Sequence, residues 1–221
     1  LWLTGEHLIL NDWVNGFQDR DNKIVKEFQT SFHSSFWEFY LYALSKEAGF
    51  EIDFSKNRPD FIITKPIKFY MEAVVANIRQ GGQQETERTL DDILSMIQPY
   101  WQQENFYESM NESITRYSSA FISKSKKYTE YSREPYWDPN APYVIALSGY
   151  EQINYGNNFH YAMLALLYGM YLNIKEDYYD IIQSILKPNS ESPIPIGLFL
   201  LDTFSHISAV IFSCTMTLGK L

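Results

Sequence analysis

Residues 58–74 of the chain read Arg-Pro-Asp-Phe-Ile-Ile-Thr-Lys-Pro-Ile-Lys-Phe-Tyr-Met-Glu-Ala-Val, and this stretch decides the predicted fold. Two β-type runs meet in it. The first begins at Asp60 and the second covers residues 68–77, with a tight connection predicted at residues 64–66. Each run carries one carboxylate, that of Asp60 and that of Glu72.

The surroundings of Glu72 are apolar. Side chains alternate between the two faces of a strand, so Glu72 is predicted to share a face with Tyr70 and Val74. Burying an unpaired carboxylate is costly, and a cation, a metal or water must compensate it. Asp60 and Glu72 on adjacent strands therefore predict a site for a hard cation.

The same residues carry a family resemblance. Pro59-Asp60, followed after eleven residues by Glu72-Ala73-Val74, resembles the motif of the PD-(D/E)xK nuclease superfamily. The resemblance implies a restriction-endonuclease-like fold in which Asp60 and Glu72 bind Mg²⁺ or Mn²⁺. In that superfamily a lysine two residues after the Glu helps to activate water, and here Val74 stands in its place. Either another lysine is supplied from elsewhere, or the protein has lost cleavage.

A third acid is predicted upstream. Residues 22–48 follow a helical pattern, and Gly49 is a suitable stop. Glu38 is a single acid in the apolar run of this helix. It is either an exposed acid at the edge of the helix or, as the resemblance implies, the accessory Glu that nucleases of this superfamily often carry before the first core strand.

The order of predicted elements agrees with the resemblance. The chain is expected to be a single α/β domain over residues 1–221, with an α-β-β-β-α-β core over about 22–172 and terminal strands within 173–221. Further elements are expected besides the helix at 22–48 and the strands at 60–64 and 68–77. The expected strands are one at 50–54, a central strand at 143–148, and a pair at 196–201 and 207–214. The expected helices lie at 86–103, 107–131 and 159–172, with a further helical stretch around 178–186.

Composition limits the setting. A net charge of −9 argues against a surface that coats nucleic acid broadly, while a local basic groove remains allowed. The chain contains no run of about 18 apolar residues, so no transmembrane helix is expected. The single cysteine, Cys214, excludes an internal disulfide and a Cys-rich zinc site, and a reducing cytoplasm is the simplest location.

Several lysines are candidates for the missing motif lysine. Lys68 is predicted to lie about 13 Å from Glu72 along its strand, Lys65 is similarly remote in the hairpin, and Lys46 lies about 12 Å beyond Glu38 along the helix. The sequence does not choose among them. The basic patch at residues 124–127 is either a solvated helix end or a phosphate site.

Other motifs are weaker. Gln152, after the fourth strand, is either a polar loop residue or an amide that reaches the site or a nucleotide. His33 and His160 are expected to be structural, and His7 and His206 have no partner at metal spacing. The glycines form no phosphate-binding loop or dinucleotide fingerprint.

The sequence therefore predicts a metal-dependent nuclease whose partner is nucleic acid, with DNA favoured over RNA, bound in a local groove. A homodimer is compatible with this expectation. The alternative is an inactive binding or protein-interaction module that kept the fold, and a third reading is that the motif is coincidental. Basic residues converging around Asp60 would favour the nuclease, and an apolar or blocked pocket would favour the module.

Overall fold

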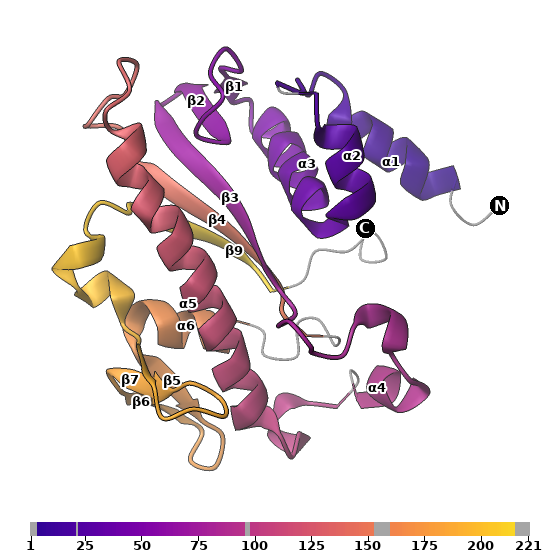
Figure 1. Ribbon diagram of the computed structural model, residues 1–221, viewed down its shortest axis with the longest axis vertical. Coiled ribbons are helices and arrows are strands. Elements are labelled where there is room, and N and C mark those ends of the chain that lie inside the picture. Colours follow the sequence, from indigo (N-terminus) through magenta and orange to yellow (C-terminus); the bar gives the residue numbers. More distant parts are fainter. Residues whose placement is uncertain (1–3, 21, 96–97, 153–159, 215–221) are drawn as a thin grey trace.

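A computed structural model describes residues 4–20, 22–95, 98–152 and 160–214. The protein is an α/β structure in which helices flank a central mixed sheet (Figure 1). Its helices are α1 (Thr4–Val14), α2 (Ile24–Thr30), α3 (Phe32–Glu47), α4 (Leu90–Ser95), α5 (Phe106–Tyr131) and α6 (Tyr161–Tyr168). Its strands are β1 (Glu51–Ile52), β2 (Phe61–Lys65), β3 (Phe69–Asn77), β4 (Tyr143–Tyr150), β5 (Met170–Asn173), β6 (Tyr178–Ile181), β7 (Ser184–Leu186), β8 (Pro193–Pro195) and β9 (Ala209–Ser213). Within these ranges, every helix is too short or too polar to cross a membrane.

The central sheet has the strand order β1-β2-β3-β4-β9. β2 is antiparallel to both of its neighbours, β1 and β3, whereas β3, β4 and β9 run parallel. The long helix α5 lies in the connection between the parallel strands β3 and β4, as parallel pairing requires a crossover. β4 is buried along its whole length, which explains its almost wholly apolar sequence.

The sheet separates two hydrophobic cores. Successive side chains of β3 and β4 point alternately into one core and the other. On one face, Trp37 and Leu41 of α3 pack on Met71 and Ala73 of β3, and the Trp37 indole donates a hydrogen bond to the carbonyl oxygen of Ala146 at 3.0 Å. Figure 1 shows α3 on this side of the sheet and α5 on the other. Helix α3 is thereby fixed against the strand that carries Glu72.

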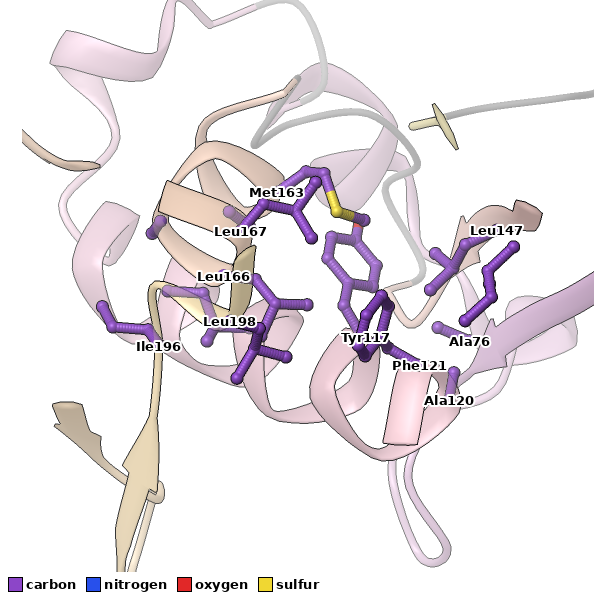
Figure 2. Close-up of a cluster of buried hydrophobic side chains, with 14 of the residues drawn as sticks. Ala76, Tyr117, Ala120, Phe121, Leu147, Met163, Leu166, Leu167, Ile196 and Leu198 are labelled. Carbon is purple, nitrogen blue, oxygen red and sulfur yellow. The ribbon is translucent and has the colours of Figure 1, made fainter. Parts of the chain in front are cut away.

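The larger core lies on the α5 face. Figure 2 shows Tyr117 and Phe121 of α5 between the sheet residue Leu147 and the α6 side chains Met163 and Leu166. Burial of such large side chains stabilises by about 1.5–3 kcal/mol each. This packing fixes the rotation of α5 about its axis, and hence which of its polar residues point towards β3.

The structure confirms the predicted order of the first helix, three strands, a long helix and a central strand, which are α3, β1, β2, β3, α5 and β4. The ends of these elements differ from the predicted ones. The helix expected over 22–48 is interrupted at Ser31, whose backbone leaves helical geometry and separates α2 from α3. Gly49 follows the helix in the left-handed conformation, as expected of a stop. The strand expected at 50–54 is reduced to Glu51–Ile52.

The helix predicted over 86–103 is wrong. Only Leu90–Ser95 is helical, between short 3-10 turns at Glu85–Glu87 and Tyr100–Gln102, and residues 96 and 97 lie outside the described ranges. Leu90 and Leu94 are 70% and 53% exposed. Because these two leucines are not covered, packing at their positions does not stabilise a longer helix.

Predictions for the last fifty residues are also wrong in part. The stretch around 178–186 forms β6 and β7 instead of a helix, in keeping with its Tyr and Ile content. The run at 196–201 contains a 3-10 turn that packs Leu198 under α6, so it does not pair with the last strand. That strand, β9, pairs instead in parallel with β4. The helix predicted at 159–172 ends at Tyr168 and gives way to β5, while residue 159 lies outside the described ranges.

Candidate active site

Asp60 lies directly before β2, one residue outside the strand in which it was predicted. The Arg20 guanidinium fixes this segment by donating hydrogen bonds to the carbonyl oxygens of Lys56, Pro59 and Asp60 at 2.6, 3.2 and 3.0 Å. The Asp60 Oδ2 atom accepts the backbone N–H of Ala73 at 2.8 Å. The first acid is thereby attached to the strand that carries the second.

Glu72 is fully buried, yet four donors surround its carboxylate. Its Oε2 accepts the backbone N–H of Asp60 at 3.1 Å. Its Oε1 accepts the ammonium groups of Lys124 and Lys127 at 2.9 and 3.0 Å and the Tyr131 hydroxyl at 3.1 Å. The compensation that a buried carboxylate needs therefore comes from three side chains of α5.

These contacts give the two acids opposite charge preferences. Burial alone would raise the pKa of Glu72, but Lys124 and Lys127 outweigh it and hold that pKa below its usual value. The pKa of Asp60 is raised by burial and by the charge of Glu72, which Lys124 offsets only in part. At neutral pH Glu72 is the firmly ionised member of the pair, and Asp60 gains most from an additional cation.

Glu38 is brought to the same region by α3. Burial, together with the negative charge of Asp60, raises the pKa of Glu38 to about 8. Lys124 acts on Glu38 in the opposite direction. The three predicted acids therefore interact electrostatically, from a helix, a pre-strand loop and a strand, and burial together with their mutual repulsion holds the pKa values of Glu38 and Asp60 above their usual range.

The lysine nearest to both acids is Lys124 of α5. It was not among the lysines considered from the sequence as replacements for the motif lysine. The Lys124 Nζ atom lies 2.9 Å from Glu72 Oε1 and 3.5 Å from Asp60 Oδ2. The three lysines considered from spacing are engaged elsewhere: Lys46 with the carbonyl of Asp12, Lys65 with Glu51, and Lys68 with the carbonyl of Tyr136.

Val74 and Lys124 line the same hollow of about 220 Å³, which also touches Glu38. An ammonium from α5 thus lies beside the valine that occupies the motif position. The missed residues Lys124, Lys127 and Tyr131 had a detectable signal: their i, i+3, i+7 spacing places them on one helical face. The sequence could not show that this face meets Glu72.

Gln152 is not part of this region. Its amide donates to the Ser109 carbonyl and the Ser113 hydroxyl and accepts from the Ser109 hydroxyl. Ser113 is separated from Lys124 by about 16 Å along α5. His33 pairs with Glu85, and His206 contacts Ser125.

Within the described part of the chain, no three or more His, Cys, Asp or Glu side chains form a group arranged to hold a metal ion. Mg²⁺, however, is usually bound through one or two carboxylates, with water and substrate phosphates completing its shell. Asp60 fits this role, because its side chain is 26% exposed and its electrostatic setting favours a further cation. Glu38 is the second fitting ligand, whereas the Oε1 atom of Glu72 already accepts three donors.

Comparison of the chain with protein-family models, curated proteins and solved structures gives no match in any of the three.

Proposed function

We propose that the chain is a metal-dependent nuclease of the PD-(D/E)xK type, with a restriction-endonuclease-like fold and with Lys124 in place of the motif lysine. One observation carries the proposal: the Lys124 ammonium lies within 3.5 Å of both the Asp60 and the Glu72 carboxylates. Val74 occupies the position of the motif lysine, and Lys124 of α5 lines the same hollow as Val74. The α-β-β-β-α-β order of the elements supports the same fold.

The roles follow from the contacts. Asp60 and Glu38 supply oxygen ligands for Mg²⁺ or Mn²⁺, which when bound would lower the pKa of a water molecule and neutralise phosphate charge. Glu72, held by four donors, orients the Lys124 ammonium and the Asp60 backbone. Lys124 is placed to stabilise negative charge that develops on a phosphate bound beside Asp60. Lys124 and Lys127 keep Glu72 ionised, and Tyr131 donates a further hydrogen bond to it.

Basic groups near Asp60 favour an active nuclease over a binding module that does not cleave nucleic acid. Besides Lys124 and Lys127, the guanidinium of Arg20 lies against the backbone of Asp60. Such convergence is what a phosphate-binding site requires, and it is the arrangement that the sequence-based reasoning associated with an active nuclease.

The test is cleavage of end-labelled DNA and RNA, each single- and double-stranded, with Mg²⁺ or Mn²⁺. The unsubstituted chain is expected to cleave, and Lys124→Met and Asp60→Asn are each expected to lose about a hundredfold or more of that activity. Lys126→Met is the matched control, because Lys126 is exposed on the same helix turn. Equal rates for Lys124→Met and Lys126→Met would remove Lys124 from the chemistry.

A binding module without cleavage is the second candidate function. The observation that favours it is the saturation of Glu72 Oε1 by Lys124, Lys127 and Tyr131, which forms a buried ion-pair cluster without any metal. Calorimetric titration with Mn²⁺ separates the two candidates. Binding that is lost in Asp60→Asn supports the nuclease, and no binding to the folded chain supports the module.

A further inference from the structure

A groove leads away from the acids along β3. β2 pairs with β3 only as far as Met71, so the remainder of β3 has β4 on one side and no strand on the other within the described residues. Two contacts mark this open edge: the Ala73 N–H donates to Asp60, and the Asn77 carbonyl accepts the Arg116 Nε–H at 3.0 Å. Helices α3 and α5 lie on opposite faces of the sheet beside it (Figure 1).

The groove widens at its far end. The hollow beside Val74 and Lys124 shares Ser34 and Asn77 with a second hollow of about 600 Å³. At the rise of a β-strand, Asn77 lies about 17 Å from Glu72. A chain running along the β3 edge therefore passes the acids and reaches the larger hollow after a few nucleotide lengths.

The larger hollow combines aromatic rings with short polar side chains. Phe32, at the start of α3, is 39% exposed there. The His33 ring stacks on Tyr150, with ring centroids 3.9 Å apart and planes 6° from parallel. Ser34 and Asn77 also line the wall, and the Asn77 side chain hydrogen-bonds His33. Planar rings with adjacent amide and hydroxyl groups are the chemistry by which proteins hold an unpaired base.

The segment after β3 closes one side of this hollow. Gln84, Glu85 and Thr86 line it, and the Glu85 carboxylate contacts the His33 ring of α3, with Oε1 3.2 Å from Nε2. A paired base is stacked within a duplex and cannot enter a hollow walled on several sides, whereas an unpaired base can. Arg116 uses its Nε–H for the Asn77 carbonyl, and its guanidinium has further donors for a backbone phosphate.

On the basis of the nuclease function proposed above, we propose that the hollow lined by Phe32, His33 and Asn77 binds an unpaired nucleobase, which makes single-stranded nucleic acid the substrate class of the site. The base contacts the exposed ring of Phe32, and the polar wall bonds its edge. The strand then follows the open edge of β3 to Lys124 and Asp60.

The test is equilibrium binding in EDTA, measured by fluorescence anisotropy. The probes are a labelled DNA strand of about 12 nucleotides, its RNA equivalent, and the blunt duplex of each. The unsubstituted chain is expected to bind the single strands at least about tenfold more tightly than the duplexes. Phe32→Ala is expected to weaken single-strand binding about tenfold and to leave duplex binding unchanged.

Two further variants keep the test independent of folding effects at Phe32. Asn77→Asp is nearly isosteric and places a negative charge on the wall of the hollow, so it should weaken single-strand binding as well. Trp101→Ala is the matched control, because Trp101 is 58% exposed and lies outside the hollow. Equal affinity for single strands and duplexes, or a preference that neither Phe32→Ala nor Asn77→Asp reduces, overturns the inference.

Failure of the base site and failure of the nuclease function give different results, because binding is measured without metal. Cleavage that depends on Asp60 but shows no single-strand preference retains the nuclease and refutes the base site. A single-strand preference lost in Phe32→Ala, with no cleavage under any metal condition, retains the base site and refutes the nuclease.

Discussion

Replacing Lys124 by Met tests the electrostatic centre of the molecule. The substitution keeps the length and apolar stem of the side chain and removes the ammonium that contacts Glu72 at 2.9 Å and Asp60 at 3.5 Å. Removing one partner of a buried ion pair generally costs about 3–5 kcal/mol. Because Lys127 and Tyr131 still bond Glu72, we expect a cost at or just below the lower limit of that range, about 2–3 kcal/mol.

The loss should depend on pH in a defined direction. The pKa of Glu72 is lower in the folded chain than its usual 4.5, so its ionisation stabilises the fold above that pH, and this stabilisation disappears as the pH falls through the folded pKa. Lys124→Met reduces this depression of the pKa. The deficit in unfolding free energy should therefore be full near neutral pH and should shrink below about pH 4.

Urea denaturation across this pH range measures the effect, with Lys126→Met as the control, expected within about 0.5 kcal/mol of the unsubstituted chain. The double variant Lys124→Met/Glu72→Gln should be more stable than the sum of the two single effects predicts, because it removes both charges of the pair. A Lys124→Met deficit equal to that of Lys126→Met, or strict additivity in the double variant, would refute the assignment of Lys124 as the counter-ion of Glu72.

Three further variants test the surrounding groups. Glu38→Gln should raise the melting temperature at pH 8 and leave it unchanged near pH 4, because the pKa of Glu38 is raised from 4.5 to about 8 and its carboxyl destabilises the fold as the pH rises between those values; an equal change at both pH values contradicts this. Asp60→Asn should stabilise the fold at pH 7, since the raised pKa of Asp60 makes its ionised form unfavourable. The same variant should abolish Mn²⁺ binding in calorimetry. Destabilisation at pH 7 would show that Lys124 dominates the environment of Asp60. Gly149→Ala should cost about 1–3 kcal/mol in urea denaturation, because its Cβ would lie 2.5 Å from the Tyr117 hydroxyl and 2.8 Å from the Glu151 carboxylate; a neutral effect would mean that this buried pair can move aside.

The sheet was predictable because its strands carry strong local signals. β4 is an apolar run bounded by Pro142 and a loop, and β3 places Glu72 on the face shared with Tyr70, as its alternation required. Where tertiary packing decides, local signals failed. Leu90 and Leu94 have helical spacing, yet no layer covers them and the helix stays short.

The acids of the candidate site were predictable, whereas their cation was not. Asp60 and Glu72 belong to one hairpin, so the distance between them follows from strand geometry. Lys124 is 52 residues from Glu72 and reaches it only because the buried side chains Tyr117 and Phe121 fix the rotation of α5. The spacing of Lys124 and Lys127 marks a helical face, but the partner of that face is a tertiary property.

The electrostatics of this region are difficult to explain by stability alone. Replacing a buried ion pair by apolar side chains is often neutral or stabilising, so a scaffold has no need for Glu72 in the middle of a core strand. Glu38 and Asp60 add cost, because both have raised pKa values and repel a neighbouring acid. Perturbed acids beside a lysine in a hollow are typical of functional sites. A divalent cation would favour the ionised forms of Glu38 and Asp60, which the fold alone disfavours, so the destabilising feature of the fold is also the one that the nuclease function we propose requires.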